Sequence, residues 1–273
     1  MTDPLFYDSH MHTPLCKHAR GEPEVYADVA RRRGLKGIIF TCHNPTENDA
    51  WNAGSRMSAS QIEDYFALVE RGRLACAGQV DVRLGLESDY APGMEAWLET
   101  LHGMAGYSYI LGSIHPHCAE YQNLYLKDDF FAFQKTYFDH LATAAETGLF
   151  DAVSHPDLIK NVDPEAWDLG RLKDDIGRAL DRIASSGVAM ELNTSGLNKA
   201  VPEMNPGAEI LSEAYTRSIP VVIGSDAHEP DRVAADFGPA LDVLAEVGYT
   251  HVSVFLDRQR SDLSIEDIRR TLK

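Results

Sequence analysis

Seven apolar segments of this 273-residue chain each end on a residue that can bind a metal ion. They are Asp8-Ser9-His10-Met11-His12, Thr41-Cys42-His43, Gly85-Leu86-Glu87-Ser88-Asp89, Gly112-Ser113-Ile114-His115, Val153-Ser154-His155, Glu191-Leu192-Asn193 and Gly224-Ser225-Asp226-Ala227-His228. One histidine after a strand carries little information, because buried histidines often have purely structural roles. Seven such ends predict a fold in which the strands finish together around one site.

The apolar runs predict eight strands that alternate with helices. The expected strands cover Leu5–Tyr7, Gly37–Thr41, Val80–Leu86, Tyr107–Ile114, Phe150–Ser154, Val188–Leu192, Pro220–Gly224 and Val252–Leu256. Most lack polar alternation, which is typical of strands buried on both faces of a parallel sheet. The expected helices lie near residues 24–33, 58–69, 94–104, 130–147, 169–183, 207–216, 232–247 and 264–272, and Pro239 interrupts the seventh.

Strict alternation of strands and helices, without a linker or repeat, predicts a single α/β barrel domain over residues 1–273. Catalytic residues of such barrels lie at the carboxyl ends of the strands, where all seven segments fall. The eighth run, Val252–Leu256, has no ligand-type end, so its place in the barrel is open.

The composition excludes several classes of partner. A net charge of −17 disfavours binding to long nucleic acids, because the protein surface repels the phosphate backbone. The chain has no basic, apolar leader and no apolar run of membrane-spanning length, which predicts a cytoplasmic protein without a membrane partner. Its four cysteines have no metal-binding spacing and indicate no disulfide framework. Nothing in the sequence sets the oligomeric state.

The residue types at the strand ends favour a metal centre. Residues two apart in an extended segment point to the same face, which groups Asp8, His10 and His12 and pairs Asp226 with His228. Imidazoles and carboxylates suit zinc, iron(II) or manganese. Glu87 can bridge two ions, and we expect Asp8 to be able to orient a ligating imidazole as its hydrogen-bond acceptor.

Seven of the eleven histidines fall on these segments or on the loop that follows one of them. We assign ordinary structural roles to the others, His102, His117, His140 and His251, with His117 the nearest exception because it follows His115. Motifs of serine hydrolases, P-loop proteins and dinucleotide-binding folds are absent from the sequence. A metal-dependent hydrolase is therefore the expected class.

The ordered set of motifs resembles the polymerase-and-histidinol-phosphatase (PHP) superfamily. The motifs that carry the resemblance are Asp8–His12, Thr41–His43, Gly85–Asp89, Gly112–His115, His155–Asp157 and Ser225–His228. Other stretches resemble the stand-alone histidinol-phosphate phosphatases of that superfamily, and these are residues 12–18, 55–58, 87–93 and 191–197. Cys42 departs from the pattern, because the family usually has an acidic residue at this place.

The resemblance implies a distorted (β/α)7 TIM-like barrel that holds three divalent metal ions, of zinc, manganese or iron. It implies that His10, His12, Glu87 and Asp226 hold one ion. It implies that Glu87, His115 and His155 hold a second ion, and that His18, His43 and His228 hold a third.

The expected activity is hydrolysis of a small phosphorylated substrate, L-histidinol phosphate, by a water or hydroxide that the metals activate. We expect Asp8, Glu87 and Asp226 to serve catalysis, with Asp8 or Asp157 able to carry a proton. Candidate phosphate contacts are Arg56, Lys160 and Lys199, and candidate contacts to the rest of the substrate are Asp89, Tyr90 and Asn193. The alternatives are a PHP phosphoesterase acting on another small ester or on nucleotides or oligonucleotides, and a catalytically silent metal-binding module.

Overall fold

The computed structural model describes residues 6–273, apart from the side chain of Asn48. Seven parallel strands form one sheet in the order of the sequence. They are β1 (Tyr7–Asp8), β2 (Gly37–Phe40), β3 (Asp81–Asp89), β4 (Tyr109–Ser113), β5 (Ala152–Val153), β6 (Ala189–Asn193) and β7 (Val221–Gly224). The strands match the expected positions, although Leu5, where the first was predicted to begin, lies outside the described residues.

The sheet curves until its two edges meet. Just beyond β1 and β7, Met11 and Ala227 form a parallel bridge. The amide of His12 donates to the carbonyl oxygen of Ala227 at 2.9 Å, and the amide of Ala227 donates to that of His10 at 3.1 Å. The predicted distorted (β/α)7 barrel is confirmed. Because this closure involves the first and last ligand segments, it brings residues 10–12 and 226–228 side by side.

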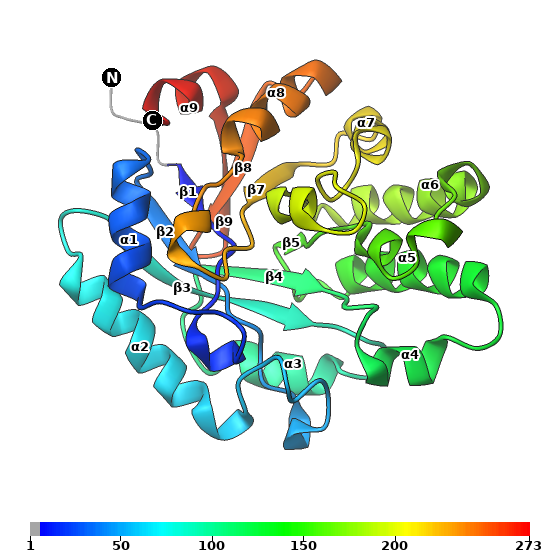
Figure 1. Cartoon of the computed structure of the whole chain (residues 1–273), viewed down its shortest axis with the longest axis horizontal. Coiled ribbons are helices and arrows are strands. Elements are labelled where there is room, and N and C mark those ends of the chain that lie inside the picture. The colour runs from blue at the N-terminus through cyan, green and yellow to red at the C-terminus, as the bar shows by residue number, and fades with distance from the viewer. Residues whose placement is uncertain (1–5) are drawn as a thin grey trace.

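Helices cover the outside of the barrel (Figure 1). They are α1 (Pro23–Arg32), α2 (Ile62–Ala75), α3 (Glu95–His102), α4 (Ala119–Tyr125), α5 (Phe130–Glu146), α6 (Leu169–Ser186), α7 (Ala208–Thr216), α8 (Phe237–Val247) and α9 (Ile265–Thr271). The amide of Ser58 donates to Gln61 Oε1 at 3.0 Å, a capping contact just before α2. None of the helices in residues 6–273 combines the length and apolarity needed to cross a bilayer.

The eighth apolar run does not join the barrel sheet. It forms β8 (His251–Leu256), which pairs antiparallel with β9 (Gln259–Ser264). Phe255 of β8 stacks on Tyr109 with ring centroids 5.5 Å apart. It belongs to a buried cluster inside the barrel that also contains Tyr7, Ile39, Tyr109, Leu111, Ala152, Ala189 and Val222. The hairpin therefore closes the amino end of the barrel with an apolar side chain, opposite the end that carries the ligands.

Three parts of the helix and strand prediction were wrong. The short helix α4 was not predicted. The helix expected over residues 232–247 begins only at Phe237, so Pro239 lies in its first turn, where a missing amide proton costs nothing. The polar strand β9 was missed, because its side chains are mostly exposed and show no apolar alternation. Its pairing with β8 makes it a strand.

The hydroxyl group of Tyr65, on α2, ties together the backbones of β2 and β3 where these strands approach the site. Its oxygen lies 2.8 Å from the carbonyl oxygen of Phe40 and 2.9 Å from that of Gly85. It also accepts a hydrogen bond from the amide of Cys42 at 3.2 Å. Because Tyr65 is fully buried, water cannot replace these contacts.

We predict that Tyr65→Phe lowers the free energy of unfolding by about 1–3 kcal/mol, the cost of leaving buried backbone groups without their partner. Denaturant unfolding of the metal-free protein would measure this change.

Tyr107→Phe is the matched control. The Tyr107 hydroxyl is also buried but has no hydrogen-bond partner among the described residues. Its removal should leave stability unchanged or raise it. Equal losses of unfolding free energy in the two variants would show that the hydrogen bonds of Tyr65 do not stabilise the fold.

Candidate metal centre

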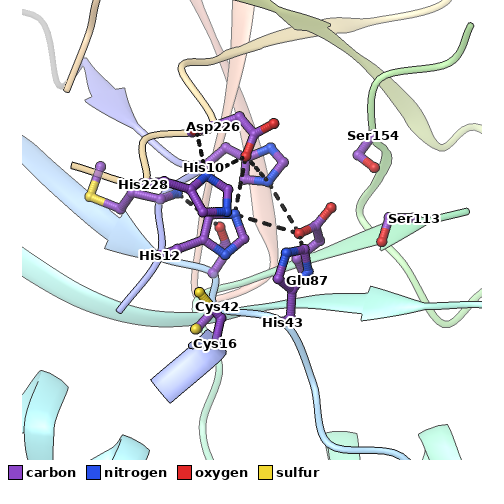
Figure 2. Close-up of polar contacts among 12 residues, drawn as sticks. His10, His12, Cys16, Cys42, His43, Glu87, Ser113, Ser154, Asp226 and His228 are labelled. Carbon is purple, nitrogen blue, oxygen red and sulfur yellow. Dashed lines mark hydrogen bonds and ion pairs between the residues drawn. The ribbon is translucent and has the colours of Figure 1, made fainter. Parts of the chain in front are cut away.

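The carboxylate of Glu87, near the end of β3, lies at the centre of the site (Figure 2). Five imidazoles from four other segments surround it, and both Glu87 and His10 are almost completely buried. A carboxylate this far from water needs charged or hydrogen-bonding partners. The ends of the parallel strands supply them at this one point.

The first predicted ligand group is assembled as expected. His10 Nε2 lies 3.4 Å from Glu87 Oε2 and 3.6 Å from Asp226 Oδ1. His12 Nε2 lies 3.6 Å and 3.2 Å from the same two oxygens. Ligands arranged tetrahedrally at about 2.0–2.1 Å from a zinc ion are roughly 3.3 Å apart. The four side chains thus have the spacing that one divalent ion requires.

The second group meets the other oxygen of Glu87. His155 Nε2 lies 3.1 Å from Glu87 Oε1, and His115 Nε2 lies 3.5 Å from it. Oε2 faces His10 and His12, whereas Oε1 faces His115 and His155. This division between the two oxygens is the geometry of a carboxylate that bridges two ions.

The third group lies at the more exposed side of the site. The Nε2 atoms of His18 and His228 are 2.8 Å apart, and the His43 ring centroid lies 5.3 Å from that of His18. His43 also contacts the first two groups, because its Nδ1 is 2.8 Å from Glu87 Oε2. Donor atoms of His12, His43 and His228 all lie within 4.8 Å of one another. His43 therefore stands between the groups rather than in the third alone.

The electrostatics of this cluster suit cation binding. Several buried donor atoms have no hydrogen-bond partner in the described structure, namely His10 Nε2, His12 Nε2, His43 Nδ1 and Glu87 Oε2. Burial lowers the pKa of His43 well below its ordinary value and that of His228 to about 3, so both imidazoles are neutral. Against the effect of burial, the neighbouring carboxylates raise the pKa of His10 well above its ordinary value and that of His12 to about 9, so a bound cation would replace a proton on each. Burial would also raise the pKa of Glu87, but the imidazoles of His10 and His115, whose own pKa values are raised, hold it well below the usual range. Neutral imidazoles and ionised carboxylates are the forms that bind metals.

Carboxylates behind the ligands hold two of the imidazoles in place. Glu191 Oε1 is 2.6 Å from His10 Nδ1, and Glu191 Oε2 accepts from the amide of His155 at 3.0 Å. Asp89 Oδ1 is 2.7 Å from His115 Nδ1. Such contacts orient an imidazole so that its other nitrogen faces the metal. From the sequence, Glu191 was expected only as part of a strand end, although its position two residues before Asn193 placed both side chains on the same face of the strand.

The expectation that Asp8 orients a ligating imidazole is wrong, since Glu191 occupies that position beside His10. Asp8 is fully buried and accepts hydrogen bonds from the hydroxyl and amide of Ser225 and from the amide of Ala234. These contacts hold the loop that carries Asp226 and use both carboxylate oxygens of Asp8. The expected catalytic role of Asp8 stays a prediction.

Two of the three predicted phosphate contacts are buried and already paired with carboxylates. Arg56 is 2% exposed and pairs with Asp89, while its Nη1 donates to the carbonyl oxygen of Asn44 at 2.9 Å. Lys160 is 0% exposed, and its Nζ lies 2.8 Å from both Asp157 Oδ2 and Glu203 Oε1. Both cations are neutralised beneath the site. A free charge would be needed to bind a phosphate.

The predicted contacts to the rest of the substrate are buried as well. Asn193 is completely buried, and its Nδ2 donates to Glu191 Oε2 at 3.0 Å. Asp89 is occupied by Arg56 and His115, and the buried Tyr90 donates to Glu95 Oε1 at 2.7 Å. Asp157, the other proposed proton carrier, accepts from Lys160 and from the amide of Gly207. These residues support the walls of the site from behind.

A cavity of about 580 Å³ opens above the ligands. Its lining combines ligand residues with His117, the histidine expected to be the nearest exception to a structural role, and with Ser55 from the stretch 55–58. Nothing in the sequence pointed to the other lining residues, which are Asn52, Leu158, Asn161, Val162 and Ala200. Lys199 lines it too, with its Nζ 4.0 Å from Asp226 Oδ2. Among the described residues of this lining, Lys199 is the sole lysine or arginine. The arrangement offers one cation opposite a cluster of metal ligands.

A family model described as PHP domain matches residues 8–195 of the chain. The chain is 38% identical over 251 residues to a protein of Deinococcus radiodurans named "Probable histidinol-phosphatase". The alignment covers 88% of this chain and 93% of that protein. A Bacillus subtilis protein named "Histidinol-phosphatase" is 27% identical over 271 residues, covering 88% of this chain and 98% of the relative.

The fold is similar to that of histidinol phosphate phosphatase from Lactococcus lactis, which was crystallised with zinc, L-histidinol and phosphate. The TM-score is 0.78, with 94% of this chain and 99% of that chain covered. The two sequences are only 16% identical, so this likeness concerns the arrangement of the backbone.

We predict that Glu191→Gln lowers the metal affinity roughly 10- to 100-fold, the usual effect of removing an acceptor behind a ligating histidine. Glutamine replaces one carboxylate oxygen with an NH2 group, which cannot accept a hydrogen bond. The NH2 group then faces either His10 Nδ1 or the N–H groups of His155 and Asn193, and that contact is lost. Elemental analysis and competition with a chelator would measure the affinity.

Glu99→Gln, which changes an exposed carboxylate on α3, controls for the loss of one negative charge.

Glu87→Ala removes the central carboxylate and should lose bound metal and activity together. Normal metal content in Glu87→Ala would refute the bridging assignment, and normal affinity in Glu191→Gln would remove its positioning role.

Proposed function

The chain belongs to the PHP domain family, and on that premise we propose that it is, as one domain, a metal-dependent phosphomonoesterase that hydrolyses L-histidinol phosphate to L-histidinol and phosphate. The observation that carries the proposal is the position of Glu87, shared between two sets of imidazoles at the base of the cavity. The name and high coverage of the Deinococcus relative support the substrate.

We propose three divalent ions, of zinc, manganese or iron, held by the three predicted groups of ligands. The separations and the buried donor atoms without partners fit such ions. When bound, the ions would supply positive charge that attracts phosphoryl oxygens and lowers the pKa of a coordinated water. The orienting contacts from Glu191 and Asp89 keep the imidazole nitrogens directed at that charge.

Glu87 and Asp226 act as ligands in this proposal and not as proton donors. Burial would raise the pKa of Asp226, but the charge of His10 and the hydrogen bond with His12 hold it well below its ordinary value, as the neighbouring imidazoles do for Glu87. Both groups are therefore ionised at neutral pH. Ser195 Oγ donates to Asp226 Oδ2 at 2.9 Å, which leaves Oδ1 facing His10 and His12.

Lys199 is the proposed protein contact to the phosphate. It is partly exposed, lines the cavity and lies beside Asp226, whereas Arg56 and Lys160 are already paired below. An ammonium group at this position stabilises the charge that builds on phosphoryl oxygens in the transition state. It also screens the repulsion between the substrate dianion and an acidic protein surface.

The remaining wall of the cavity suits the leaving group. Leu158 and Val162 offer apolar surface, and Asn52, Ser55 and Asn161 offer uncharged hydrogen-bonding groups. A flat heteroaromatic ring with a short polar chain requires this combination. The cavity volume of about 580 Å³ is within the range that small ligands occupy.

We predict that the metal-loaded protein releases phosphate from L-histidinol phosphate with a kcat/KM far above that for other phosphomonoesters. A panel containing sugar phosphates, nucleotides and p-nitrophenyl phosphate would measure the preference. Equal rates across the panel, or a preference for nucleotides, would retain the metal centre and refute the substrate.

We predict that Lys199→Ala lowers kcat/KM roughly 10- to 100-fold, the cost of losing a hydrogen bond to a charged group. Metal content should stay normal, because Lys199 is not a ligand. Lys173→Ala, an exposed lysine on α6, is the matched control and should keep full activity. An unchanged kcat/KM in Lys199→Ala would exclude it from phosphate binding.

A further inference from the structure

Two cysteines lie directly beneath the metal ligands, although the proposed mechanism does not use them. Cys16 and Cys42 are both 0% exposed. Their sulfur atoms and a nitrogen of His12 all lie within 4.8 Å of one another. Figure 2 shows the two sulfur atoms together on the side of His12 that faces away from Asp226.

His12 differs from His10 and His115 in what lies behind it. Its Nε2 faces Asp226, and its Nδ1 is buried without a hydrogen-bond partner among the described residues. In His10 and His115 the corresponding nitrogen meets a carboxylate oxygen. An imidazole that binds a metal through Nε2 carries its proton on Nδ1 and needs an acceptor there. Beside His12, the sulfur pair occupies that place.

The two cysteines belong to the segments that carry the ligands. The carbonyl oxygen of Cys16 is 2.8 Å from His18 Nδ1. Cys42 directly precedes His43, and its sulfur accepts hydrogen bonds from the amide and hydroxyl of Thr13 at 3.4 Å and 3.2 Å. A movement of either sulfur is therefore transmitted to His12, His18 or His43.

We propose that Cys16 and Cys42 form an oxidisable dithiol, and that its conversion to a disulfide by a hydroperoxide disrupts the metal centre. Bonded sulfurs are about 2.05 Å apart, so both side chains must rotate out of the positions that support His12 and Thr13. This inference rests on the proposed metal centre and not on the identity of the substrate.

The reaction is balanced with hydrogen peroxide as the oxidant. The sulfur of one thiol attacks the peroxide O–O bond, which gives a sulfenic acid and one water. The second sulfur then attacks the sulfenic sulfur, the S–S bond forms, and the departing hydroxide takes the remaining thiol proton as a second water. Two electrons pass from the sulfurs to the peroxide oxygens.

The test uses the metal-loaded Cys76→Ser/Cys118→Ala variant, which keeps only the two cysteines of interest. Cys76 and Cys118 are outside the proposed site, so this variant should begin with normal metal content and phosphate release. Treatment with hydrogen peroxide, followed by catalase, should produce a mass loss of about 2 Da and a linked peptide containing Cys16 and Cys42. At least one metal equivalent should be released. Dithiothreitol followed by added metal should restore the free thiols and the metal content.

Adding Cys42→Ser to this background should abolish the linked peptide and the reversible metal loss. Metal loss of the same size without Cys42, or a linked protein that retains all its metal, would overturn the proposal. If the protein binds no metal before oxidation, the proposed metal centre itself is wrong. This outcome is distinct from a failure of the dithiol proposal, in which metal is bound but does not respond to the disulfide.

Discussion

The structure depends on the burial of one negative charge, the Glu87 carboxylate. An ionised carboxylate cannot be moved out of water without compensating partners. Here the partners are imidazoles from the ends of β1, β2, β4 and β5, which meet only if the sheet curves into a barrel. The same charge would attract divalent ions, which bind through the imidazole nitrogens that face it. Folding and metal binding thus draw on one set of contacts.

A second layer of charge determines how the ligands point. Glu191 lies behind His10, and Asp89 lies behind His115 with Arg56 behind it in turn. Gly224 has no side chain because a Cβ there would collide with Glu191 and His10. Burying Arg56 in this layer removes it from the cavity. The cavity is left with Lys199, whose single charge is opposite the ligands.

The two ends of the barrel interior are lined by different kinds of side chain. At the amino end, Phe255 of the β8–β9 hairpin completes an apolar interior with Tyr109 and Leu111. At the carboxyl end, polar side chains replace that apolar packing, and the closing bridge between Met11 and Ala227 positions the first and last ligand segments. A well-packed base allows the upper rim to accommodate buried charges and loops that would not fold alone.

The sequence by itself determined the parallel strands and the residue types of the proposed metal centre. These features are local, because apolar runs set the strands and parallel strands all end at one rim. The sequence did not reveal which polar residues face the cavity. Arg56, Lys160 and Asn193 follow strands just as Lys199 does, yet they are buried against Asp89, Asp157 and Glu191. Only the tertiary structure decided this, because folding determines which side chains are buried. It also brings Asp89 to Arg56 and Glu203 to Lys160, and these distant carboxylates neutralise charges that could otherwise bind a substrate.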